Sequence, residues 1–134
     1  HDLRVEEAHF LPVPVQSPRI PIWACGTWPN KAPFRRAARW DGAVAIIDPV
    51  ANRAISPEEV RAIRAFMGRQ RVTAAPFDIV VILWSEGGRA PQELEMVAAY
   101  AEAGATWWLE DLTTERFGSL QDIRARLRKG PPAL

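Results

Sequence analysis

The stretch FDIVVILW, residues 77–84, decides the fold class of this chain. It is almost continuously apolar and is bounded by a turn-forming segment on its carboxyl side. Runs of this kind are typical of strands in a parallel sheet, in which helices cover both faces. We therefore predict a buried parallel strand here, with both of its faces covered.

Apolar runs of the same kind predict three further strands, at residues 20–25, 43–47 and 106–109. Each of the four strands is followed by a segment with apolar residues at helical spacing. These helical segments begin at Lys31, Ser56, Pro91 and Ser119. The order is thus strand–helix repeated four times, at roughly 30 residues per unit, which is the size of a βα unit. The sequence predicts an α/β fold.

Two of the expected helices have clear boundary signals. Ser56 is a capping residue, Pro57 suits the first helical position, and Glu59 is placed to close a capping box. The apolar stripe of this helix is expected to consist of Val60, Ile63, Phe66 and Met67. The helix that starts at Pro91 is expected to end at Gly104. Its inward face is expected to hold Leu94, Val97, Ala98 and Ala101.

Strands that alternate with helices form a parallel sheet with right-handed crossovers, and two closures fit this pattern. One is an open doubly wound sheet with helices on both faces. The other is half of a (β/α)8 barrel, which needs about 250 residues when whole. Both closures place function at the carboxyl ends of the strands. Those ends are residues 26–28, 48–49, 85–88 and 110–111.

Length and composition exclude several classes of protein. The chain has 134 residues, 48% hydrophobic and 25% charged, which is too apolar for a disordered chain and suits one domain or part of one. A formal net charge of +1 argues against nucleic-acid and membrane-surface partners. No apolar run is long enough to span a bilayer, and no signal peptide is recognised. His1 in place of Met indicates processing or a piece of a longer protein.

Cysteine and histidine usage argues against a metal site. Cys25 is the single cysteine, and His1 and His9 are the two histidines, so Cys-rich or His-based coordination is not expected. A single cysteine also suits a reducing, cytoplasmic compartment. Because Cys25 lies in an apolar strand without a nearby His or Lys, we expect an inert, buried thiol.

The loop expected after the first strand is the most informative candidate site. Gly26 lets the backbone approach a ligand, Thr27 offers a hydroxyl, and Asn30 is placed to cap the following helix. Free N–H groups at a helix start favour an anion such as phosphate, and Lys31 could reach it. The alternative is a tight turn without a ligand, with the basic residues forming the solvated face of the helix.

The other strand ends do not build an active site by themselves. Glu110 and Asp111 are adjacent on a strand and therefore point to opposite faces, so they are not an obvious acid/base pair. Trp107 and Trp108 also point opposite ways, and core packing is the default for both, with a ring stacked on a planar cofactor as the alternative. No nucleophile triad, Walker loop or metal-ligand spacing is present, so no catalytic residue is assigned.

Two blocks of the sequence resemble a known family. PIWACGTWPN at residues 21–30, followed by PFRRAARWDG at 33–42, closely resembles the luciferase-like, flavin-dependent oxidoreductase family. The segment AEAGATWWLE at 101–110 looks like the approach to the last strand in one branch of it. The resemblance runs from about Leu11 to Pro132. Many members have a second Gly where this chain has Cys25.

This resemblance implies the C-terminal half of a (β/α)8 TIM barrel. Residues 1–19 would be an extended lead-in segment, and residues 20–134 would hold strands five to eight. Members bind FMN or a deazaflavin coenzyme and act on small organic substrates as oxidoreductases or monooxygenases. In the family, the loop after the fifth strand helps to hold the cofactor phosphate, which points to Gly26, Thr27 and Asn30. The expected partner is the missing N-terminal half barrel or a second copy.

An isolated half barrel should lack turnover, and its open sheet edges favour dimers or aggregates. Two alternatives remain. The chain could be a non-catalytic α/β module that binds a phosphate or nucleotide as a monomer with a covered sheet, or an inert truncated half barrel. Replacing Thr27 with Glu separates them, since it should abolish ligand binding in the flavin protein and in the binding module only.

Overall fold

The computed structural model describes residue 12 and residues 15–47 and 53–132, and the predictions for His1, His9, Asp48 and Pro49 lie outside these ranges. The chain is an α/β protein in which parallel strands alternate with helices, as predicted. In chain order the elements are β1 (Trp23–Trp28), α1 (Lys31–Ala37), β2 (Gly42–Ile47), α2 (Pro57–Gln70), β3 (Asp78–Leu83), α3 (Pro91–Ala103), β4 (Trp107–Glu110), α4 (Thr114–Phe117) and α5 (Leu120–Arg128).

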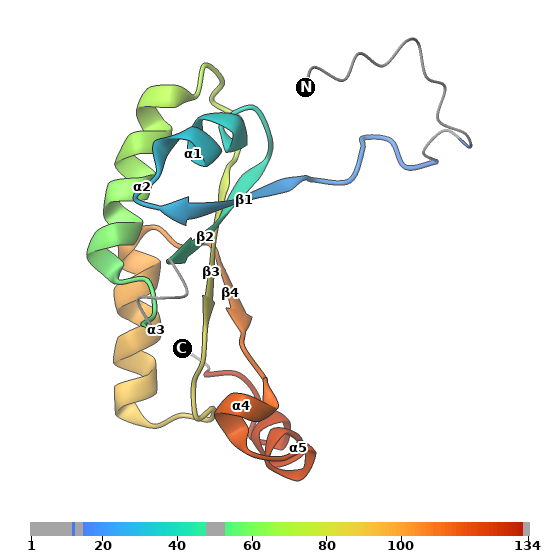
Figure 1. Cartoon of the computed structure of the whole chain (residues 1–134), viewed down its shortest axis with the longest axis vertical. Coiled ribbons are helices and arrows are strands. Elements are labelled where there is room, and N and C mark those ends of the chain that lie inside the picture. Colours follow the sequence, from blue (N-terminus) through green and yellow to red (C-terminus); the bar gives the residue numbers. More distant parts are fainter. Residues whose placement is uncertain (1–11, 13–14, 48–52, 133–134) are drawn as a thin grey trace, which may run out of the picture.

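The four strands form one parallel sheet in the order β1-β2-β3-β4. Each strand therefore lies beside its neighbour in the chain, and every crossover moves in the same direction along the sheet. Right-handed crossovers of this kind place their helices on one face. Figure 1 shows α1, α2 and α3 along that face, with α4 and α5 beyond the ends of β3 and β4. A doubly wound sheet would reverse its strand order and place helices on both faces.

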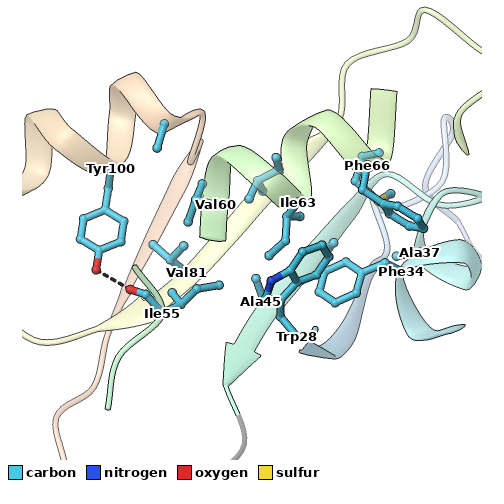
Figure 2. Packing of buried hydrophobic residues seen from close by; sticks show 14 of the residues in the cluster. Trp28, Phe34, Ala37, Ala45, Ile55, Val60, Ile63, Phe66, Val81 and Tyr100 are labelled. Carbon is cyan, nitrogen blue, oxygen red and sulfur yellow. Dashed lines mark hydrogen bonds between the residues drawn. The ribbon is translucent and has the colours of Figure 1, made fainter. Parts of the chain in front are cut away.

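The core lies between this face and the helices α1–α3 (Figure 2). The strands contribute alternate residues, namely Trp28, Ala43, Ala45, Ile79, Val81 and Leu83. The predicted stripe of α2 is confirmed, since Val60, Ile63, Phe66 and Met67 are all buried. The Trp28 ring packs edge-on against Phe34 and Phe66, with centroid distances of 5.4 and 6.4 Å.

The boundary signals of α2 and α3 are confirmed. The Ser56 hydroxyl accepts from the Glu59 N–H at 3.3 Å, and the Glu59 carboxylate accepts from the Ser56 N–H at 2.9 Å. Arg53 donates to the same carboxylate at 2.8 Å, which lowers the pKa of Glu59. Gly104 ends α3 with a φ of 104°, a left-handed conformation that favours glycine.

The inward face of α3 differs from the prediction. Tyr100 and Ala103 are the buried residues of this helix, and the Tyr100 hydroxyl donates to the Ile55 carbonyl at 2.5 Å (Figure 2). This bond and the T-shaped contact of Tyr100 with Trp108 rotate the helix so that Ala101 is exposed. The other residues expected inward are half-buried, namely Leu94, Val97 and Ala98.

One strand boundary was predicted wrongly, and one short helix was not predicted. β1 runs to Trp28 rather than ending at Cys25, because its parallel pairing with β2 continues as far as Trp28 opposite Ile47. The short helix α4 was not predicted at all. Its Arg116 is held by Asp111 at 3.2 Å, a contact that only the folded chain creates.

The second face of the sheet is apolar, and no described helix covers it. We call it the bare face and define it by Trp23, Cys25, Thr27, Val44, Ile46, Asp78, Val80, Ile82, Trp107 and Leu109, which alternate with the core residues along the strands. Ile82 is 40% exposed and Trp107 51% exposed. The prediction that both faces are covered is therefore wrong for the described residues, because the sequential strand order places α1–α3 together.

Side chains from different strands bridge the amino end of the bare face. The rings of Trp23 and Trp107 lie 5.3 Å apart, although they come from the first and last strands of the sheet. Trp23 Nε1 donates to Asp78 Oδ2 at 3.0 Å, and Thr106 Oγ1 donates to Asp78 Oδ1 at 3.0 Å. Gly42 lies beneath this bridge, where a Cβ would come within 2.6 Å of Trp23 Cδ1. The first and last strands are thus tied together across the sheet.

Candidate functional site

The candidate site lies at the carboxyl ends of the four strands, where parallel α/β proteins bind their ligands. β1 ends at Trp28, β3 at Leu83 and β4 at Glu110. The side chains that follow these ends, together with the upper part of the bare face, would form the wall of a pocket.

We predicted that Gly26 lies in a loop, but it lies inside β1. It is buried and faces the helix layer, where a Cβ would come within 2.9 Å of Pro33 and 3.0 Å of the Phe34 ring. This glycine therefore allows α1 to pack closely on β1. This packing accounts for a glycine at position 26 without a ligand.

Thr27 is the one residue of the predicted three whose side chain faces the bare face. It alternates along β1 with Gly26 and Trp28, both of which are buried on the helix side. It is half-buried and lies opposite Ile46 in the register of β1 and β2. The Thr27 hydroxyl therefore lies near the carboxyl end of the bare face.

Asn30 is the N-cap of α1, as predicted. Its side-chain oxygen accepts from the Ala32 N–H at 3.1 Å, and its own N–H donates to the Thr27 carbonyl at 3.1 Å. The cap bond thus occupies the Ala32 N–H, which is one of the helix-start donors that the phosphate hypothesis requires. Of the three predicted residues, Gly26 thus faces the helices, Asn30 caps α1, and Thr27 faces the bare face.

Lys31 packs on aromatic rings instead of extending toward the strand ends. Its Nζ lies 3.0 Å from the Trp28 ring centroid and 5.2 Å from that of Phe66. Burial, and secondarily the positive charge of Arg69, lower the pKa of Lys31. The expected solvated face of α1 is confirmed by its exposed arginines, Arg35, Arg36 and Arg39.

Arg116 and Trp84 form a stacked pair at the end of β3, which we did not predict. The guanidinium of Arg116 lies 3.7 Å from the ring centroid of Trp84, which follows β3 on the bare-face side. Asp111, which follows β4, accepts from Arg116 Nε at 3.2 Å. No local signal pointed to Arg116, because its partners come from two other segments of the chain.

A second polar cluster joins the ends of β3 and β4 to α5. Arg126 is 5% exposed, and its Nε and Nη2 donate to the carbonyl and hydroxyl of Ser85 at 2.6 Å each. Glu110 accepts from the Ser85 N–H at 2.6 Å and lies 3.2 Å from Arg126 Nη2. Gly87 packs on Arg126 with a φ of 75°, so the glycine loop accommodates this arginine.

Glu110 therefore forms an ion pair with Arg126, and Asp111 forms one with Arg116. They point to opposite sides, as predicted. Trp107 and Trp108 also separate as predicted. Trp107 lies on the bare face, and Trp108 packs against the core.

Cys25 is exposed on the bare face, so the predicted buried thiol is wrong. The cause is the same as for Ile82, since no described helix covers this side of β1. Within residues 15–47 and 53–132, no group of three or more metal-ligating side chains comes together. No helix in these ranges is long and apolar enough to cross a membrane.

Two hollows in the described part of the chain lie away from Thr27. One of about 430 Å³ lies between α2 and α3 near the amino end of β3, and Arg64, Arg71 and Phe77 are among its lining residues. The other, of about 170 Å³, lies between the end of β4 and α5. Neither is lined by the predicted phosphate-binding residues.

Comparisons of the chain with protein-family models, with curated proteins and with solved structures found no match. The family resemblance therefore stays a prediction from the sequence. The candidate site is an apolar sheet face whose carboxyl end carries the Thr27 hydroxyl and the stack of Arg116 on Trp84.

Proposed function

We propose that this chain forms the C-terminal half of a (β/α)8 barrel of the luciferase-like, flavin-dependent oxidoreductase type. The observation that carries the barrel part is the sequential parallel sheet with α1–α3 on one face and an apolar face opposite that no described helix covers. In a whole barrel, helices surround the sheet and the inner face is filled with apolar side chains. The bare face has the position and composition of such an interior.

The register rows of the bare face support the same proposal. Cys25, Val44, Val80 and Trp107 lie in one row across all four strands. Val80 is fully buried within that row, although it faces away from the helices. A barrel interior is filled by layers of inward apolar side chains, with alternate strands contributing to each layer, and a face of apolar residues on all four strands can supply such layers.

The flavin part of the proposal rests on the sequence resemblance. It assigns FMN or a deazaflavin coenzyme, with a small organic substrate, to the mouth of the completed barrel. Of the residues in this chain, Thr27 is then the predicted contact that faces the pocket. The isolated chain supplies part of the pocket wall, and we expect it to lack turnover because the opposite wall is missing.

Flavin binding tests this proposal directly. FMN or a deazaflavin is added to the chain, and the anisotropy of flavin fluorescence is followed. We expect binding by the wild-type chain and its loss in Thr27→Glu, because a carboxylate at this position repels a phosphate and fills the space in front of the hydroxyl. Gln92→Glu is the matched control, since it adds the same charge at an exposed position of α3.

The outcomes separate the alternatives. Binding of neither flavin would overturn the flavin part of the proposal and favour an inert half barrel. Equal competition by pyrophosphate and by FMN, with no binding of riboflavin, would favour a module that recognises only phosphate. Binding that Thr27→Glu leaves unchanged would remove Thr27 from the site.

A further inference from the structure

Eight of the eleven large apolar side chains that are exposed in the described residues lie on three parts of this molecule, and the other three are Val15, Trp40 and Val72. Ile82, Trp84, Trp107 and Leu109 lie on or next to the bare face. Ile20 and Ile22 precede β1, and Leu120 and Leu127 lie on α5. All three parts belong to the surfaces that barrel closure would involve, since β1 and β4 are the two edges of the sheet and α5 is the helix that follows β4.

The two edges of the sheet restrict what can cover the bare face. Within the described residues, β1 and β4 each pair on one side only. Unpaired backbone groups on such edges are templates for another strand. An occupant of the bare face that also satisfied both edges must offer two parallel strands, one for each edge, and a matching apolar surface.

We infer that a second copy of this chain closes on the bare face, so that two copies form an eight-stranded parallel barrel around a two-fold axis. In this arrangement β4 of each copy pairs with β1 of the other, and both edges are satisfied at once. A two-fold interface of this kind closes on itself and leaves no edge for further growth. The inference rests on the half-barrel part of the proposed function and not on the flavin.

The exposed apolar area fits a stable dimer. Half-exposed side chains of this size present roughly 100 Å² each, so the eight residues named above present roughly 800 Å² per copy. That is about the area that each partner buries in a stable interface of standard size. A charged side chain placed within such an interface without a partner would strongly oppose it.

The mass of the chain in solution tests the inference. Light scattering after size exclusion is expected to give twice the 15.0 kDa of one chain. Ile82→Arg places a guanidinium in the bare face and is expected to weaken the dimer by about a hundredfold or more. Val72→Arg is the matched control, because Val72 is fully exposed after α2 and lies off the bare face. It should leave the dimer intact.

The Cys25 thiol gives an independent measurement on the same surface. It lies exposed on the bare face of a single chain, and closure would bury it. Its reaction with a thiol reagent such as dithionitrobenzoate is therefore expected to be slow in the wild type and in Val72→Arg, and at least tenfold faster in Ile82→Arg. Far-UV circular dichroism of each variant verifies that the chain remains folded.

Several results would overturn the two-fold closure. These are a wild-type monomer with a rapidly reacting Cys25, a dimer that Ile82→Arg leaves unchanged, and open-ended assemblies larger than a dimer. A monomer would indicate that a different half barrel covers this face. The dimer can also form in a chain that binds no flavin, in which case the flavin proposal fails while this inference stands.

Discussion

The two faces of the sheet are built from similar residues but have different surroundings. In β3, Ile79, Val81 and Leu83 face the helices and are buried, whereas Ile82 faces the other way and is 40% exposed. Apolar character along a strand predicts that both of its faces are shielded from water. It does not show whether segments of the same chain pack on both faces.

The largest effect is expected where α5 is attached to the strand ends. Arg126→Leu removes the cation beside Glu110 and leaves that carboxylate without its partner, which should cost about 3 kcal/mol of unfolding free energy. Urea denaturation measures this loss. Arg124→Leu, at an exposed position of the same helix, should change stability by less than about 0.5 kcal/mol. Equal losses in the two variants would show that the buried cluster does not anchor α5.

The next effect compares the two faces directly within one strand. Ile79→Ala creates a cavity in the core and should cost about 2–4 kcal/mol, because Ile79 is 4% exposed. Ile82→Ala on the bare face should cost less than about 1 kcal/mol in a monomeric sample. Both are measured by urea denaturation at low protein concentration. A larger loss for Ile82→Ala that grows with concentration would indicate that the bare face is covered in solution.

A smaller effect is expected from two neighbours in β1 that point to opposite faces. Gly26→Ala forces α1 away from β1 and should cost about 1–3 kcal/mol. Cys25→Ala on the bare face should cost less than about 1 kcal/mol in the monomer. Gly68→Ala is the glycine control, because its Cβ meets nothing within 4 Å in α2, and it should stabilise the chain by about 0.5–1 kcal/mol.

The smallest effect is expected at the amino end of the sheet, where Asp41, which precedes β2, holds the start of β1. Arg19 donates to this carboxylate at 2.6 Å, as does the Ile22 N–H, and these bonds lower the pKa of Asp41. A lowered pKa stabilises the fold above the unfolded-state value of about 3.9, and that stabilisation is lost as the pH falls through the folded-state pKa.

Asp41→Asn should therefore reduce the dependence of stability on pH below about pH 4, as measured by thermal unfolding across a pH series. Arg19→Gln should produce part of the same change, and the double variant should add little to Asp41→Asn. An unchanged pH dependence in Asp41→Asn would contradict this assignment.

Local chemistry explains which parts of the fold could be predicted. The capping box at Ser56 and Glu59 and the left-handed Gly104 are formed by residues close in the chain, so their signals are complete in the sequence. The stripe of α2 was predictable for the same reason. Asn30 was recognised as a cap, and its cap bond is present.

Contacts between distant segments explain what could not be predicted. Arg126 is buried only because Ser85 and Glu110 meet it from two strand ends, and nothing near it in the chain shows this. We predicted that Gly26 contacts a ligand. A glycine that makes room for Phe34 of a helix has the same local sequence pattern as a ligand-binding glycine. The exposure of Cys25 depends on the strand order, which periodicity along the chain does not report.

The sequential strand order also has a consequence for how this chain folds. Each strand pairs only with its neighbour in the chain, but a helical crossover separates the paired residues, such as Gly42 and Asp78, and parallel pairing of this kind slows folding. Such a sheet resembles a short stack of repeats, which can fray from either end. The contact between Trp23 and Trp107 joins the two ends, so it forms only when all four units are in place and makes their unfolding cooperative.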